Sequence, residues 1–277
     1  MPAAMEVFRH GGCEAVVWRD AVPWQGGWAA AVGQVQCGNA KDGAALLRAI
    51  ADEVPGWLMA PLDGDTWHAY RLAVDGSSRR PFALEPPADP VLQAALESAG
   101  FAPVLRYASA ALALDGARVR RLGASGLRLR RYDPARAEQE LVLMHRMALA
   151  GFMQAPLFTP IPFGPFAALY RPYLPRLLPD LVLFAEDRDG TPAGFVFGLP
   201  DFAEGAAPAT AILKTYAALR PGTGAVLAGA FHDAARRLGF REVIHALMHD
   251  DNLSLRHSRL IGGKVFRRYA LFGRPPA

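Results

Sequence analysis

The strongest local chemical signal in this chain is a glycine-containing turn that leads into an amphipathic helix. Gly222 and Gly224 stand between a strand-like run over 210–219 and a helix whose Leu227 and Phe231 share one apolar face. Glycine leaves the backbone open to a phosphate, and the first amides of a helix lack partners and carry partial positive charge. The segment can therefore hold a diphosphate, although a tight turn without a ligand is the commoner use of such a pair.

The neighbours of this turn exclude two nucleotide-binding motifs. A Rossmann motif needs a third Gly or Ala at position 227, where Leu227 stands, and an acidic residue at the end of the next strand, which Glu242 begins. No Gly-Lys-Ser/Thr triplet follows, so a P-loop is excluded as well. We also find no Gly-x-Ser-x-Gly elbow and no His, Asp or Glu cluster with metal-ligand spacing, so no metal is expected.

The turn belongs to the second of two halves that differ in charge. With 277 residues, 52% hydrophobic and 20% charged, the chain predicts a folded protein of two domains, which we place at 1–115 and 116–277. The first part has 8 basic and 13 acidic residues (net −5), and the second has 22 and 13 (net +9). A basic second half favours an anionic partner.

Arginines crowd the boundary between the halves. The alternation in Leu127-Arg128-Leu129-Arg130 predicts a strand with the arginines on one face, and a solvated edge is favoured over an anion site. The arginines concerned are Arg118, Arg120, Arg121, Arg128, Arg130 and Arg131.

The pattern of turns and apolar residues predicts most elements of the second half. Asp133-Pro134 begins a helix that runs to about Ala150, and 152–179 is too rich in Pro for more than a short helix and a lid. The remaining elements are a hairpin turning at 187–190, the strand 210–219, a helix stopped by Gly239, the strand 242–248, a short helix after Asn252 and a strand at 264–272.

The first half is harder to interpret. It holds a helix at 43–54, a strand at 56–60 and a helix at 89–99. A short echo joins the two halves, because Gly100 precedes Arg106-Tyr107-Ala108 by the same spacing that separates Gly262 from Arg268-Tyr269-Ala270. The repeated pattern suggests that each half ends with a helix followed by a closing strand, as after a duplication.

The run from Leu213 to Phe272 resembles the acyl-coenzyme A-binding half of the GCN5-related N-acetyltransferase (GNAT) superfamily. The likeness rests on Gly222, Gly224 and Leu227, on Asn252 after the next strand, and on Gly263 eleven residues later. The first half resembles the companion domain of tandem members but has no equivalent glycine turn. The resemblance implies an α/β (α+β) protein of two GNAT-like domains, each with a mixed, mostly antiparallel sheet flanked by helices, the first of them degenerate.

The resemblance also implies a set of ligand contacts. The diphosphate of acetyl- or acyl-coenzyme A would lie on the amides of the turn, and its pantetheine arm would run beside the preceding strand and bond to Asn252. The implied contacts are Tyr216, Ala217, Ala218, Leu219, Arg220, Gly222, Thr223, Gly224, Ala225, Val226 and Asn252. Three departures weaken this set: Leu219 stands where the family has Arg or Gln, Arg220 is one place late, and Arg259 replaces the Tyr that many members use as an acid.

The implied reaction is attack of an amine on a thioester. A protonated amine needs a base, for which Glu204, His249 and Asp250 are candidates near the expected cleft. Tyr269 or Tyr216 can donate a proton, but a thiolate of pKa near 8.5 needs little acid help. Each candidate also has a structural interpretation: a mobile loop for Glu204, a strand end for His249, a helix cap for Asp250 and strand packing for the tyrosines. In the first half, the stretch around His68 looks the most functional: Trp67, Tyr70 and Arg71 can wall a substrate pocket at the domain junction, although packing is the commoner role.

We therefore expect an acyltransferase that acts on a small-molecule or peptide amine. A GNAT fold that binds acyl-coenzyme A without turnover is one alternative, and an Arg-rich protein that binds nucleic acid or tRNA is another, less favoured one. No apolar run approaches the length of a membrane span, so the expected location is cytoplasmic, with no membrane partner, Cys13 and Cys37 as reduced thiols, and a homodimer left open.

Overall fold

The computed structural model describes residues 5–76, 78–115 and 126–276. The elements of the first half are β1 (Met5–His10), β2 (Cys13–Trp24), β3 (Gly27–Gln36), α1 (Ala40–Glu53), β4 (Trp57–Ala60), β5 (Leu72–Gly76), α2 (Pro90–Ser98) and β6 (Ala102–Ala113). Those of the second half are β7 (Leu127–Arg131), α3 (Ala137–Phe152), α4 (Phe163–Tyr170), β8 (Val182–Asp187), β9 (Pro192–Pro200), β10 (Thr210–Ala218), α5 (Thr223–Arg237), β11 (Glu242–His249), α6 (Leu253–Leu260) and β12 (Lys264–Arg274).

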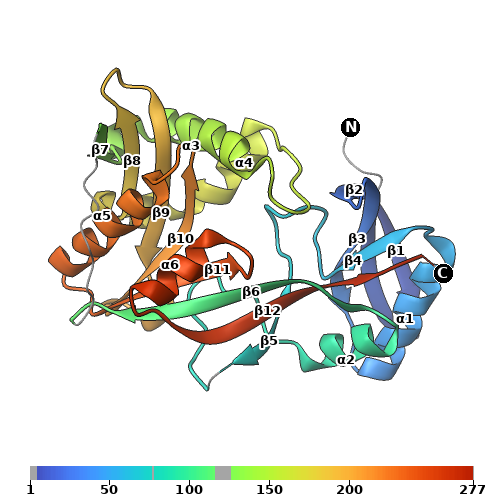
Figure 1. Cartoon of the computed structure of the whole chain (residues 1–277). Helices are drawn as coiled ribbons and strands as arrows, with labels where there is room; N and C mark the ends of the chain where they lie inside the picture. Colours follow the sequence, from blue (N-terminus) through green and yellow to red (C-terminus); the bar gives the residue numbers. More distant parts are fainter. Residues whose placement is uncertain (1–4, 77, 116–125, 277) are drawn as a thin grey trace.

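The described strands form one sheet that is continuous across both halves (Figure 1). Its order is β1-β2-β3-β4-β12-β6-β11-β10-β9-β8-β7, with β5 paired to β12. Among these pairs, β3 with β4 and β10 with β11 run parallel and the others are antiparallel. The mixed α/β class and the mostly antiparallel sheet are thereby confirmed.

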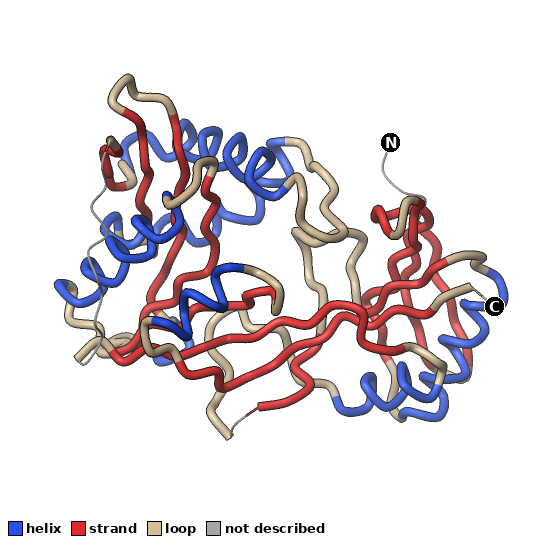
Figure 2. The backbone as a smooth tube through the Cα atoms, in the orientation of Figure 1, coloured by secondary structure: helices blue, strands red, loops and turns tan. Residues whose placement is uncertain are grey.

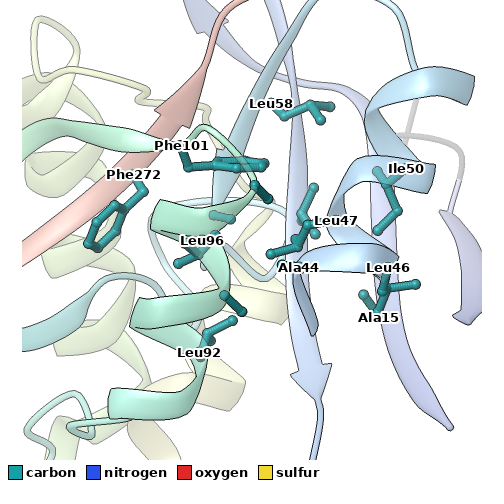
Figure 3. Close-up of a cluster of buried hydrophobic side chains, with 14 of the residues drawn as sticks. Ala15, Ala44, Leu46, Leu47, Ile50, Leu58, Leu92, Leu96, Phe101 and Phe272 are labelled. Carbon is teal, nitrogen blue, oxygen red and sulfur yellow. The ribbon is translucent and has the colours of Figure 1, made fainter. Parts of the chain in front are cut away.

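Side-chain caps fix where the helices of the first half begin, and their apolar faces pack on the sheet. The Asn39 side chain caps α1 by accepting from the Asp42 amide at 3.0 Å, and Asp89 caps α2 by accepting from the Leu92 amide at 2.8 Å. Both helices pack on one face of the sheet around Leu47, and Figure 3 shows Phe272 of β12 entering this same core. The last strand of the chain thus helps to bury the helices of the first half.

The second half covers its sheet on both faces (Figure 2). Helices α3 and α4 pack with Phe184 and Phe195 on one face, while α5 packs its Leu227 and Phe231 with Val196 on the other. The expected helix after Asp133-Pro134, the short helix after residue 152 and the hairpin at 187–190 are all present. Gly239, at φ +87°, ends α5 as expected.

The two halves exchange their final strands. Strand β6, which ends the first half, lies between β12 and β11, and β12, which ends the chain, lies between β4 and β6. The two copies of the Arg-Tyr-Ala echo face each other in this pairing, with Tyr107 opposite Tyr269, Arg106 opposite Ala270 and Ala108 opposite Arg268. The echo therefore marks a local twofold relation at the centre of the sheet.

Two expectations need correction. The two halves do not form separate sheets, because the crossed strands β6 and β12 join both into one sheet. The predicted domain boundary borders the stretch 116–125, which lies outside the described residues and contains Arg118, Arg120 and Arg121. Cys13 and Cys37, expected as thiols, are joined in a disulfide, since the β2–β3 hairpin brings their Cα atoms to 4.7 Å across 24 residues of sequence. Within the described residues, no helix is long and apolar enough to span a bilayer.

Candidate active site

Strands β10 and β11 separate halfway along their length. They pair in parallel only from Thr210 opposite Glu242 to Leu213 opposite His245. Beyond that point β10 stays paired with β9 across a register shift between Leu213 and Thr215, and β11 stays paired with β6 across a shift between His245 and Met248. The facing edges of 214–218 and 246–249 are left without a strand partner, so an extended ligand with amide groups can pair there.

The glycine turn lies at the end of the separated part of β10. Gly222 is the residue before α5, has φ +82°, and has no atom within 4 Å of the place where a Cβ would stand. The amides of Ala225 and Val226 make long bonds of 3.2 and 3.3 Å to the Gly222 carbonyl, whereas no backbone acceptor among the described residues serves the amides of Gly222 and Gly224. The turn therefore offers free donors in open space, as a diphosphate needs.

Tyr216 links the starts of α5 and α6 across the opening. A Cβ added at Gly224 would come within 2.9 Å of the Tyr216 ring, so this glycine is required by close packing. Burial raises the pKa of the Tyr216 phenol, and the Ser254 hydroxyl at the start of α6 offsets part of that rise. Asn252 caps α6 by accepting from the Ser254 amide at 3.2 Å, which leaves its side-chain NH₂ as the group available to a ligand.

The other expected contacts fall along the same edge. Ala217 and Ala218 pair with Phe195 and Gly194 of β9 on the side away from β11. Leu219 donates its amide to the Ala193 carbonyl at 2.9 Å, and Thr223 is buried. Arg220, by contrast, is held by Asp187, to which its Nη1 donates at 2.7 Å.

The equivalent edge in the first half is filled by the chain itself. Strand β3 pairs with β4 only over Ala29–Ala31, after which the Leu62 amide donates to the Val32 carbonyl and the Gln34 amide donates to Asp63 Oδ1, each at 2.9 Å. Burial raises the pKa of Asp63. The residues that would face a ligand in this half therefore already have partners.

Two of the expected catalytic residues follow the free edge of β11. His249 Nδ1 accepts from the Asp251 amide at 3.2 Å, so the neutral ring carries its proton on Nε2, which is buried and has no partner among the described residues. Asp250 Oδ1 is likewise buried and unpaired, and its Oδ2 lies 3.8 Å from Arg268 Nη1. The pair thus presents one donor and one acceptor.

The other two expected residues are held by neighbours. Glu204 accepts from the Ala209 and Thr210 amides at 2.6 and 2.9 Å and from the Thr210 hydroxyl at 2.8 Å, and its pKa falls because these bonds outweigh its burial. The Tyr269 hydroxyl donates to Glu85 and lies 3.0 Å from Ser109 Oγ, and burial raises the pKa of this phenol. Both side chains bridge elements of the fold.

A cluster at the junction of the halves was only partly anticipated. Trp67 donates through Nε1 to the Thr159 carbonyl at 2.8 Å and packs against Phe158 and Phe166, which joins the first half to the 152–179 segment. Arg71, 7% exposed, stacks on the rings of Tyr70 and Tyr107. His68 instead forms a local pair with Asp65 at 2.8 Å.

Lys214 of β10 was missed altogether. Burial, together with the charge of Arg71, lowers the pKa of Lys214 to about 8. The rarity of lysine could have pointed to this residue from the sequence. The chain has three lysines, Lys41, Lys214 and Lys264, and only Lys214 interrupts an apolar strand.

The described arginines of the boundary are neutralised by carboxylates. Arg128 and Arg130 pair with Glu186, Arg130 also with Glu140, and Arg131 with Asp180. This arrangement is the solvated, ion-paired edge that the alternation favoured. A surface hollow of about 500 Å³ between the β2–β3 hairpin and residues 153–157, bordered by Trp28 and Met153, does not include the β10–β11 opening.

Solved structures resemble this chain in fold at low sequence identity. No protein-family model matches, and no curated protein matches. A GCN5-related N-acetyltransferase from Sphaerobacter thermophilus has a TM-score of 0.57 at 17% identity, over 96% of this chain and 78% of its own. A tandem GNAT protein from the clavulanic acid biosynthesis pathway gives 0.54 at 16%, over 99% and 83%, and a GCN5-related N-acetyltransferase from Anabaena variabilis gives 0.53 at 12%, over 99% and 59%. This chain has the fold of the GCN5-related N-acetyltransferases.

Proposed function

We propose that the chain is an acyltransferase that moves an acyl group from a coenzyme A thioester to an amine, with the site in the second half. The observation that carries the proposal is the separation of β10 from β11 beside the open glycine turn at Gly222. A pantetheine arm has two amide groups that can pair with the free edges, and its diphosphate would meet the donors at the start of α5.

The residues at the end of β11 fit the proton transfers that the reaction requires. The amine nitrogen attacks the thioester carbonyl carbon, a C–N bond forms, the C–S bond breaks and its electron pair leaves on sulfur. An ammonium loses two protons in becoming an amide: one ends on the sulfur and one is released. In this proposal Asp250 Oδ1 accepts the proton lost before attack, and the His249 Nε2–H donates a hydrogen bond to the carbonyl oxygen or the sulfur as negative charge develops there. Glu204 and Tyr269 have structural partners and take no step in this proposal.

Two glycines at opposite ends of α5 provide a matched test. Gly222 and Gly239 have φ of +82° and +87°, and a Cβ at either would meet no atom within 4 Å. Asn tolerates this conformation, so Gly222→Asn and Gly239→Asn should fold alike. We expect Gly222→Asn to weaken acetyl-coenzyme A binding at least about tenfold, because a side chain would stand over the donors, a loss of roughly 1.4 kcal/mol, while Gly239→Asn binds like the wild type. Isothermal titration calorimetry measures both; equal affinities for the two variants would refute the site.

Turnover separates an enzyme from a binding protein. Release of free thiol from acetyl-coenzyme A should depend on an added amine. Binding without amine-dependent release would instead support the non-catalytic alternative.

A further inference from the structure

Arg71 is a buried cation that has no anionic partner among the described residues. It is 7% exposed, and no side-chain hydrogen bond or ion pair joins its guanidinium to any described residue; Nε and Nη1 are among the buried atoms without an acceptor. Its Cζ lies 4.1 Å from the ring centre of Tyr70 and 4.2 Å from that of Tyr107. Stacking on two rings recovers part of the cost of burying a charge, but it satisfies none of the N–H donors.

The carboxylates of neighbouring segments contact groups other than Arg71 among the described residues. Asp63 accepts from Gln34, Asp65 from Trp67 and His68, and Glu85 from Arg267 and Tyr269. Asp250 has Arg268 as its nearest cation. In the part of the chain that the structure describes, no carboxylate pairs with this guanidinium, although a buried cation usually has an anion beside it.

This guanidinium lies beside the proposed acyl-transfer site. The Tyr107 ring that it stacks on also contacts the His249 ring, with centres 5.1 Å apart. In β10, Lys214 stands at the register shift where the strand leaves β11, and the charge of Arg71 contributes to lowering the pKa of Lys214. Arg71 thus puts a positive charge behind the ring that contacts His249, and the field there favours an anion.

The backbone holds Arg71 in an uncommon conformation. Arg71 has φ +66°, and its amide donates to the Pro61 carbonyl at 2.9 Å. A bulky residue in the left-handed region costs free energy, which the surrounding contacts must offset. The guanidinium is consequently fixed in place before any ligand arrives, which reduces the entropy cost of binding.

We propose that Arg71 binds a carboxylate on the acyl acceptor, so that the substrate class is an amine that also carries a carboxyl group, such as an amino acid. An Arg–carboxylate pair in a buried setting is strong and directional. This inference rests on the proposed function for the amine, but the carboxylate contact is tested without turnover.

The test compares amines that differ only in the carboxyl group. Each α-amino acid of a panel is titrated into the full-length protein, with and without the unreactive analogue desulfo-coenzyme A, alongside the amine that lacks its carboxyl group. Arg71→Met removes the charge at similar length, Arg71→Lys keeps it, and Arg9→Met on exposed β1 is the control. We expect at least one amino acid to bind the wild type and to lose about 100-fold in affinity in Arg71→Met, with a smaller loss in Arg71→Lys, while the paired amine binds all variants equally.

The outcomes are distinguishable. Equal affinity for an amino acid and its paired amine, equal losses for both in Arg71→Met, or a preference for a phosphate-bearing amine would each overturn the carboxylate assignment. If Arg71→Met does not fold, the comparison of Arg71→Lys with the wild type decides. Failure of acetyl-coenzyme A to bind the wild type would refute the proposed function alone, since the amino-acid titrations without the analogue would still report on Arg71.

Discussion

At the scale of single residues, the fold isolates several polar side chains from water, and one pair makes stability depend on pH. His232 of α5 and His245 of β11 are buried with their Nε2 atoms 2.8 Å apart, and His245 Nδ1 lies 2.7 Å from Ser258 Oγ. Burial lowers the pKa of His232 to about 4 and that of His245 to about 3. Both rings are therefore neutral in the folded protein near neutral pH.

The sign of the effect follows from where protons bind. The unfolded chain takes up protons near pH 6.5, whereas the folded chain does so only near 4, so stability is full above about 6.5 and is lost as the pH falls toward 4. Gln can replace the Nε2 contact of His232 but does not take up a proton. Between pH 7 and 4, the free energy of unfolding should therefore fall by roughly 3 kcal/mol less in His232→Gln than in the wild type. Urea unfolding at a series of pH values measures this. The control His10→Gln, on exposed β1, should keep the pH dependence of the wild type. The same pH dependence in His232→Gln would contradict the prediction.

Some residues of the candidate site could be predicted from the sequence and others could not. The glycine turn was predictable because Gly222 and Gly224 are local signals. Arg71 and Lys214 come from different halves, and the charge of Arg71 acts on Lys214 only because of the long-range fold. Apart from the rarity of lysine, the sequence held no sign of this interaction.

At the scale of elements, the same strand-helix-strand unit occurs twice and only one copy has a free edge. In the second half β10, α5 and β11 leave 214–218 unpaired toward β11, whereas in the first half Leu62 and Asp63 bond to the edge of β3. We therefore expect one acetyl-coenzyme A per chain. The stoichiometry from calorimetry checks this, and a value near two would show that the first half also binds.

Elements with strong local signals were predicted within a few residues. Helices that end at Gly100 and Gly239 are examples. Strands β2 and β3 were missed because a register shift between Trp18 and Val22 breaks the alternation of apolar residues on which strand prediction depends. The disulfide between Cys13 and Cys37 follows from that hairpin and was missed with it.

At the scale of the whole molecule, the crossed strands β6 and β12 make each half depend on the other. Separation at the 116–125 stretch would deprive each half of a central strand and expose its apolar face. A chain with a protease site inserted there should stay a single species on size-exclusion chromatography after cleavage. The fragments 1–115 and 116–277 expressed alone should show no cooperative unfolding. Independent cooperative folding of either fragment would contradict the exchange.

We propose that the edges parted at Lys214 receive the pantetheine arm and that the turn at Gly222 receives the diphosphate. Hydrogen–deuterium exchange of the full chain with and without acetyl-coenzyme A tests it most directly, with the corresponding segments 32–36 and 57–60 of the first half as internal controls. We expect slower exchange in peptides covering 214–226 and 246–249 and no change in the controls. Binding heat without protection at 214–226, or equal protection in both halves, would contradict it.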